Sequence, residues 1–116
     1  MPIKSRYLFT AAMDVEADKD AIFNEVYDKE HVPSLLEVPG VIAVARFKRR
    51  ELEMFIGGER RKIVIEGEPT YTAIYEVESP SVLVTPQWAA AVEKGRWPSQ
   101  VRPYTKNRRH VMWEKI

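Results

Sequence analysis

The chain has 116 residues, of which 45% are hydrophobic and 30% charged, and its 18 basic and 17 acidic side chains give a net charge of +1. This length predicts a single domain over residues 1–116, and the balanced charge argues against nucleic acid or an anionic membrane surface as the main partner. Cysteine is absent, which excludes disulfides, thiolate metal sites and a cysteine nucleophile. The N-terminal apolar run is short and acidic residues follow it, so we expect no signal peptide, no membrane span and a cytoplasmic location.

Strand, helix and turn signals alternate in the first half of the chain. Residues 7–15 are rich in apolar and aromatic side chains and short enough to form a buried strand. Apolar residues from Ile22 to Val32 recur at helical spacing and predict a helix. Pro39-Gly40 marks a turn, and the β-branched and small apolar residues 41–47 predict a second strand.

The predicted helix carries one of the two histidines. Pro33 is expected to disturb this helix, because proline lacks an amide hydrogen and its ring clashes with the preceding turn, so His31 should lie at a helix end. Tyr27 lies one turn earlier, and a neutral imidazole accepts protons near pH 7, so Tyr27 and His31 are candidate catalytic residues. The alternative is that His31 only interacts with the helix C-terminus, where a cation or donor is favourable.

Gly57-Gly58 lies between two β-prone runs and predicts a tight hairpin, since its turn needs positive φ at both central positions. The register that follows predicts these facing pairs: Ile56 with Glu59, Glu53 with Lys62, and Arg49 with Glu66. It also gathers the apolar residues on one face: Leu52, Met54, Ile56, Ile63 and Ile65. The basic run over residues 46–50 is therefore interpreted as part of an amphipathic hairpin arm rather than as a nucleic-acid patch.

The second half of the chain completes the pattern. Gly67-Glu68-Pro69 predicts a bulge or bend, and Ser79-Pro80 and Thr85-Pro86 are helix-start signals. The remaining elements are predicted as a strand over residues 70–78, a helix over 86–94, a loop over 96–103 and a last strand over 108–115. The order βαββαβ predicts an α+β, ferredoxin-like antiparallel sheet with two helices on one face and an extended hairpin between its second and third strands.

The predicted sheet strands carry apolar residues on both faces. In the first strand Phe9 and Met13 lie on one side and Leu8 and Ala12 on the other. Helices cover only one face of such a sheet, so a second layer is needed over the other. We therefore predict a homodimer formed through the sheet face, with the hairpin arm holding the partner.

Ligand-binding candidates come from the strands and from the loop before the last strand. Arg46, Tyr71 and Tyr75 fall on one sheet face if the hairpin register continues, and this combination suits an aromatic acid or an enolate. The alternative is that the tyrosines are present because tyrosine favours strands. Trp97 is the candidate wall of a pocket, whereas His110, on a charged strand, is expected to be exposed.

Several site classes lack their sequence signals. The chain has no HxH, HxxxH or HExxH pattern, no glycine-rich phosphate loop and no GxSxG motif. We therefore expect no metal site and no cofactor; haem would have His31 as its only candidate ligand. An RNA-binding sheet would need an aromatic-rich K/R-G-F/Y strand, which is also missing.

The segment with Tyr27-x-x-x-His31-x-Pro33 followed by Pro39-Gly40-Val41 resembles the dimeric α+β barrel superfamily, in particular EthD-like and antibiotic-biosynthesis-monooxygenase-like proteins. The resemblance implies paired βαββαβ subunits, each with a pocket between sheet and helices, that handle hydrophobic, often aromatic compounds, frequently without a cofactor. Two function classes follow. One is a cofactor-independent enzyme in which His31 moves a proton on an aromatic or keto compound, and the other is a non-catalytic ligand-binding or structural homodimer.

Overall fold

The computed structural model describes residues 3–116. Its strands are β1 (Tyr7–Val15), β2 (Val41–Lys48), β3 (Leu52–Ile56), β4 (Glu59–Ile63), β5 (Tyr71–Val77) and β6 (Thr105–Glu114). Its helices are α1 (Asp20–Val26), α2 (Val32–Leu36) and α3 (Pro86–Ala91), with short helical turns at η1 (Ala17–Lys19), η2 (Tyr27–His31), η3 (Pro80–Val84), η4 (Trp97–Val101) and η5 (Arg102–Tyr104). No helix among the described residues is long and apolar enough to cross a membrane.

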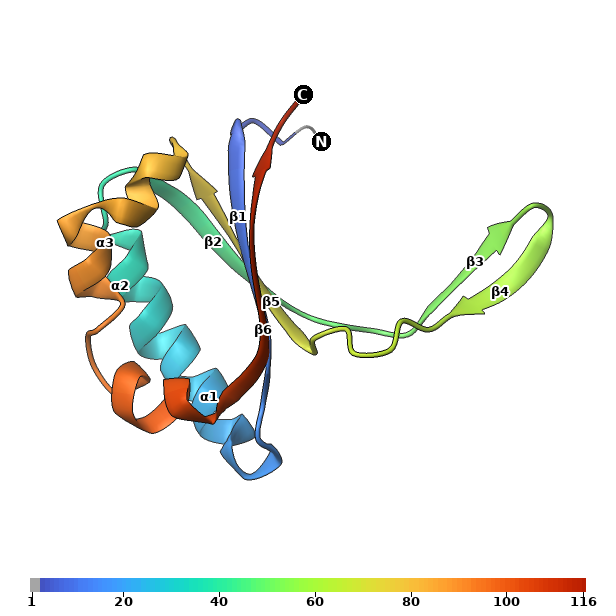
Figure 1. Cartoon of the computed structure of the whole chain (residues 1–116), viewed down its shortest axis with the longest axis horizontal. Coiled ribbons are helices and arrows are strands. Elements are labelled where there is room, and N and C mark those ends of the chain that lie inside the picture. Colours follow the sequence, from blue (N-terminus) through green and yellow to red (C-terminus); the bar gives the residue numbers. More distant parts are fainter. Residues whose placement is uncertain (1–2) are drawn as a thin grey trace.

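The main sheet has four antiparallel strands in the order β2-β5-β1-β6. All helices lie on one face of it (Figure 1). This confirms the predicted ferredoxin-like α+β fold. The strands face the helices with alternate residues, among them Met13, Tyr75 and Val77, which pack against Phe23 and Leu35 of the helical layer in one buried core.

The helix from Asp20 to Leu36 continues through Pro33, which disturbs the helix, as predicted, but does not end it. The turn just before Pro33, η2, is π-helical: the Val32 amide donates to the Tyr27 carbonyl, five residues back. This wider turn accommodates a residue that has no amide hydrogen and needs room for its ring. His31 consequently lies inside a continuous helix, not at its end, and the interpretation that it serves a helix C-terminus is wrong.

Both hydroxyl caps of the second half form as predicted. The Ser79 hydroxyl accepts from the Ser81 amide at the start of η3, and the Thr85 hydroxyl accepts from the Trp88 amide at the start of α3. The predicted loop over residues 96–103 is wrong, because the chain forms the helical turns η4 and η5 there. These turns return the chain to the sheet and carry Trp97 against the helix.

The hairpin of β3 and β4 forms a separate two-stranded sheet. Its register pairs Ile56 with Glu59 and Glu53 with Lys62, as predicted, but Arg49 donates its amide to the Thr70 carbonyl instead of facing Glu66. The hairpin projects on the side of the sheet opposite the helices (Figure 1). The radius of gyration is accordingly 15.9 Å, against about 13 Å for a compact chain of this length.

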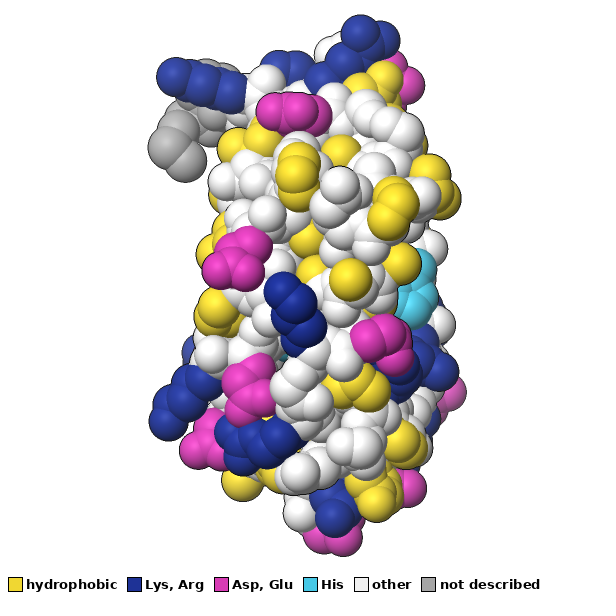
Figure 2. Space-filling model, turned by 90° about the vertical axis from the view of Figure 1, so that its left-hand side faces the viewer, with side chains coloured by type: hydrophobic (Ala, Val, Ile, Leu, Met, Phe, Trp, Pro, Cys, Tyr) yellow, Lys and Arg dark blue, Asp and Glu magenta, His cyan; other side chains and the backbone are white. Residues whose placement is uncertain are grey.

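The sheet face turned away from the helices is apolar and uncovered in the single chain. Ile42 and Phe47 of β2 are 52% and 55% exposed, and Trp113 of β6 is 54% exposed. The helical side, in contrast, mixes basic, acidic and apolar side chains without a large patch of one kind (Figure 2). The sheet face away from the helices is therefore apolar, as the apolar residues on both faces of the strands predict.

Candidate functional site

A cavity of about 240 Å³ lies between the helical layer and the sheet. Most of its wall is apolar or aromatic, and its lining residues are Phe9, Ala11, Met13, Tyr27, His31, Leu35, Tyr75, Trp88, Val92, Trp97, Arg102, Arg108 and His110. Four of the six sequence candidates, Tyr27, His31, Tyr75 and Trp97, therefore line one cavity. Concave, mostly apolar sites with a few polar groups are typical of small-molecule binding.

His31 is the buried polar residue of this wall. Its side chain is 6% exposed, and its ring stacks on the Trp97 indole with centroids 4.0 Å apart and planes inclined by 15°. The Nδ1 atom is buried and has no hydrogen-bond partner among the described residues. Burial, reinforced by the positive charges of Arg102 and Arg46, lowers the pKa of His31 to about 4. The imidazole is therefore neutral at pH 7.

Tyr27 and Tyr75 bring two hydroxyl groups to the same wall. Their oxygens are 2.8 Å apart, and both side chains are buried. Burial raises the pKa of Tyr27 and raises that of Tyr75 well above its ordinary value. Both phenols stay protonated at neutral pH, so one hydroxyl hydrogen joins the two oxygens and the second is available to another acceptor.

The helix brings Tyr27 and His31 together because they are four residues apart. Their rings meet edge to face at 5.0 Å, and Trp97 contacts Tyr27 in the same manner at 4.9 Å. Tyr75 reaches the cavity from β5, and Trp88 contacts its ring from α3 at 5.9 Å. Four elements of the chain, η2, β5, α3 and η4, thus form the aromatic wall from different sides, and the imidazole has little freedom to turn.

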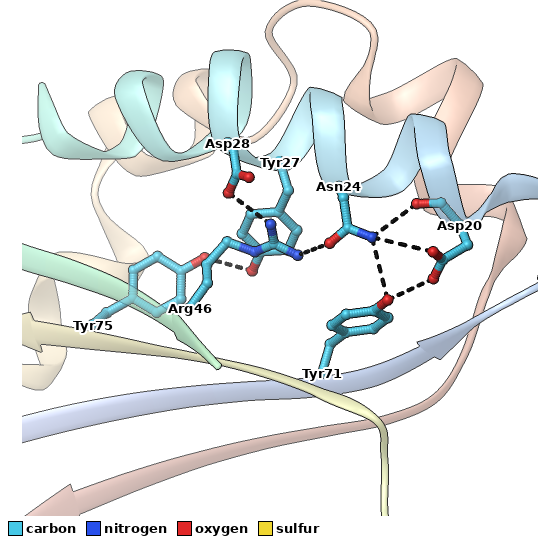
Figure 3. A network of polar contacts seen from close by, with 7 residues as sticks. All are labelled: Asp20, Asn24, Tyr27, Asp28, Arg46, Tyr71 and Tyr75. Carbon is cyan, nitrogen blue, oxygen red and sulfur yellow. Dashed lines mark hydrogen bonds and ion pairs between the residues drawn. The ribbon is translucent and has the colours of Figure 1, made fainter. Parts of the chain in front are cut away.

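Arg46 and Tyr71, the other two candidates, lie outside this cavity. Arg46 reaches from β2 to the helix, where it donates to Asp28 Oδ1 at 2.6 Å and to Asn24 Oδ1 at 2.8 Å (Figure 3). The Tyr71 hydroxyl donates to Asp20 Oδ1 at 2.6 Å. The guanidinium of Arg46 also lies 4.4 Å from the centre of the Tyr27 ring. Arg46 therefore supports the Tyr27 ring from behind the cavity and does not line it.

Three polar lining residues were not among the sequence candidates: Arg102, Arg108 and His110. His110 is exposed, as expected, but one face of its ring stacks on Phe9, with centroids 5.8 Å apart. The antiparallel pairing of β6 with β1 places His110 opposite Ala11, on the helix-covered face. Period-two alternation along β6 could have indicated this face, but only once the register against β1 was known.

Among residues 3–116, no group of three histidine, aspartate or glutamate side chains is placed to hold a metal ion. The polar groups of the cavity are two imidazoles, two phenols and two guanidinium groups, which can hydrogen-bond an organic compound.

The fold of this chain is similar to that of several proteins of known structure. The haem degrader MhuD from Mycobacterium tuberculosis, solved with two haems in its active site, matches with a TM-score of 0.61 at 13% identity, over 95% of each chain. The cofactor-independent oxygenase SnoaB from Streptomyces nogalater matches with a TM-score of 0.59 at 13% identity, over 96% of this chain and 93% of its own. An EthD-family protein from Bacillus halodurans matches with a TM-score of 0.57 at 11% identity, over 95% of this chain and 99% of its own.

No family model and no curated protein matches the sequence. The structural matches nevertheless cover nearly the whole chain, and they agree with the resemblance carried by residues 27–41. The chain therefore shares the ferredoxin-like α+β fold of these three proteins.

Proposed function

We propose that the chain is a cofactor-independent enzyme that transfers a proton on a small aromatic or keto compound, with His31 as the acid–base group. The observation that carries this proposal is the buried, unpartnered Nδ1 of His31 in an aromatic cavity. Buried polar atoms are nearly always hydrogen-bonded, so an unpartnered one in a cavity wall indicates a missing partner. The ring lines the cavity, and its other nitrogen, Nε2, is neither buried nor bonded to a group within residues 3–116, so a ligand can reach the imidazole there.

The chemistry assigned to His31 needs a neutral imidazole, and the burial of this side chain keeps it neutral at pH 7. The imidazole takes a proton from a carbon beside a carbonyl group, and the electron pair of the broken C–H bond moves into an enolate. The free hydroxyl hydrogen of the Tyr27–Tyr75 pair is suited to bond the enolate oxygen. The new imidazolium and the enolate then attract each other in a site of low polarity, which offsets the low basicity of His31.

The proposal is tested with 2-tetralone, a two-ring aromatic ketone with acidic α-hydrogens. In D₂O, an enzyme that moves this proton exchanges it for deuterium, which NMR detects without knowledge of the natural substrate. General acid–base residues typically contribute about 10² to 10⁴ in rate, so His31→Gln should reduce the exchange rate by at least about 100-fold. Arg109→Gln, on the sheet face away from the cavity, is the control and should leave the exchange rate unchanged. Equal rates in the wild-type protein and in His31→Gln would contradict the catalytic role.

The alternative function, a non-catalytic ligand-binding or structural homodimer, makes the opposite prediction. It requires 2-tetralone exchange at the buffer rate while the protein still dimerises. The unpartnered imidazole favours the enzyme, because a merely structural histidine would bond its buried nitrogen to a protein group.

Haem, the ligand of MhuD in its solved structure, fits this cavity poorly. A haem macrocycle with its side chains is larger than a cavity of about 240 Å³, and pockets for drug-sized ligands already span roughly 300 to 1,000 Å³. We therefore assign no step to haem, and a cytoplasmic location stays a prediction from the sequence.

We further propose that two copies join through the apolar sheet face. This face carries Ile42 and Phe47 on β2 and Trp113 on β6, each about half exposed in the single chain. Covering them stabilises the pair by removing apolar surface from water. Phe47→Glu should convert the dimer to a monomer in light scattering. Val84→Glu, a change at an 83% exposed apolar residue on the helical side, should leave the mass unchanged.

The hairpin arm supports the same assembly. A two-stranded sheet alone is marginally stable in water, and β3 is exposed along its whole length. The arm projects on the side of the uncovered sheet face, where a second copy would sit (Figure 1). Replacing residues 52–63 by a short Gly-Ser turn should weaken the dimer. An unchanged dissociation constant would exclude the arm from the interface.

A further inference from the structure

The cavity is positively charged as well as aromatic. The positive charge of its wall comes from Arg102 and Arg108, and the wall contains no aspartate or glutamate. A wall of this composition attracts anions and rejects cations. Since the proposed substrate class does not by itself require a charge, the excess of basic groups calls for its own explanation.

The two arginines differ in what surrounds them. Arg102 is held in place by the Glu93 carboxylate, with contacts of 2.6 and 3.0 Å, and it donates to the Val92 carbonyl at 2.8 Å. Its charge is therefore largely compensated inside the protein. None of the ion pairs within residues 3–116 includes Arg108, whose side chain is exposed and lines the cavity. Arg108 is thus the cation that a ligand can use.

The positions of these groups give the cavity two ends. His31 and Trp97 form a buried aromatic end, with stacked rings. His110 and Arg108 are exposed and form the open end, with the His110 ring stacked on Phe9. A planar ligand that enters between them would place its rings against the buried end and any polar substituent at Arg108.

From this geometry we infer that the ligand is an anionic aromatic compound, most simply a carboxylate, bound with its anion at Arg108 and its rings toward His31 and Trp97. The inference rests on the proposed function and specifies its substrate class. It also orients the compound: the carboxylate is fixed at the open end, so the reacting carbon is presented to the imidazole at the buried end. A guanidinium group binds a carboxylate through two parallel hydrogen bonds, which fixes orientation as well as charge.

The test compares two probes of nearly equal shape, 2-naphthoate and the neutral 2-naphthamide, by isothermal titration calorimetry. The wild-type protein should bind the naphthoate at least about tenfold more tightly, as is common for a charge-assisted contact. Raising the NaCl concentration from about 50 to about 500 mM should weaken the naphthoate complex and leave the amide complex nearly unchanged, because salt screens exposed charges.

Matched variants locate the effect. Arg108→Gln should reduce the preference for naphthoate to about that of a neutral site, a loss of roughly tenfold. Arg109→Gln, the next residue on β6, is the control, because Arg109 faces the other side of the sheet and pairs with Glu68. It should keep the preference. Equal effects of the two substitutions would overturn the assignment to Arg108.

The outcomes separate this inference from the proposed function. If both probes bind with equal affinity and 2-tetralone still exchanges, the anionic ligand class is wrong and the proton-transfer function stands. If the naphthoate is preferred but no exchange occurs, the cavity binds aromatic acids without the proposed catalysis. If neither probe binds, the inferred ligand class is overturned, and the exchange assay then decides the proposed function separately.

Discussion

The imidazole of His31 stacks on the indole of Trp97 with ring centroids 4.0 Å apart and planes inclined by 15°. This contact covers one face of the imidazole with an apolar surface, and the Tyr27 ring meets it edge-on at 5.0 Å. These contacts keep water away from the imidazole, and without water the charged form of the ring is disfavoured. The stack explains how a histidine can lie inside a helix, in the core, and remain neutral.

The neutral state of His31 makes the stability of the fold depend on pH. Its pKa is about 4 in the folded chain, against about 6.5 when unfolded, so the unfolded chain binds more protons between these values. Above about pH 6.5 the imidazole is neutral in both states and does not favour unfolding. As the pH falls from about 6.5 toward 4, proton binding by the unfolded chain lowers the free energy of unfolding. Between pH 7 and pH 5 the free energy of unfolding should drop by about 2 kcal/mol from this group alone.

Urea unfolding at one protein concentration, at pH 7 and at pH 5, checks this. His31→Gln should remove most of the difference. His110→Gln should retain most of it, since His110 is exposed, although burial of part of its ring also lowers its pKa. A difference that persists unchanged in His31→Gln would mean that His31 is not the titrating group.

The hydroxyl pair of Tyr27 and Tyr75 should show strong coupling. Each Phe substitution leaves the other buried hydroxyl without its partner at 2.8 Å, which costs about 1 to 3 kcal/mol. The double substitution removes both polar groups and should cost less than the sum of the two. A double-mutant cycle from chemical unfolding measures this, and strictly additive losses would show that the pair is not a unit in solution.

Arg46 should influence His31 without entering the cavity. Its side chain is 16% exposed and is held by Asp28 and Asn24, and its positive charge helps to lower the pKa of His31. Arg46→Gln should therefore raise the pKa of the imidazole, observed in an NMR titration of the ring. The loss of two charge-assisted hydrogen bonds should also reduce stability by about 2 kcal/mol. Arg6→Gln breaks an exposed pair with Glu114 instead and should change neither quantity appreciably.

Gly40 ends the turn between α2 and β2 and should not tolerate a side chain. Its φ is +92°, and an added Cβ would lie 2.5 Å from Cγ2 of Val82. Gly40→Ala should cost about 2 to 4 kcal/mol, from the left-handed backbone and from overpacking together. Gly67→Ala has a similar φ of +75° but open space around it, so it should cost only about 1 kcal/mol.

Calorimetric unfolding of both glycine variants gives the difference between them. Val82→Ala should partly restore stability in the Gly40→Ala background, because it removes the clashing methyl group. If Gly40→Ala and Gly67→Ala lose the same amount, the contact with Val82 contributes nothing.

The sequence predicted what depends on local periodicity and turn chemistry. The hairpin at Gly57-Gly58 and the cap at Thr85 both rest on a few neighbouring residues, and the structure has them as predicted. Pro33 shows the limit of such rules, since a π-helical turn absorbs the proline without ending the helix. That outcome depends on the packing of the whole helix, which no local pattern reveals.

The site prediction was wrong for side chains whose positions are set by tertiary contacts. Arg46 shares a sheet face with Tyr75, but the helix residues Asn24 and Asp28 take up its hydrogen-bonding groups and hold it outside the cavity. Arg108 was missed because β6 pairs with β1 almost a hundred residues earlier, so nothing nearby in the sequence indicates its neighbours. Both errors concern side chains whose partners lie on another element.

The register of the hairpin arm differs from that of the main sheet, since Ile56 faces Glu59 in the arm while Arg46 faces Ala73 in the sheet. The segments that join them, residues 49–51 and 64–70, take up the offset outside both ladders. The arm can therefore lengthen, shorten or disappear over evolutionary time without moving Tyr75 in the cavity. Substitutions in the arm and substitutions in the cavity therefore act on two parts of the chain that can change independently.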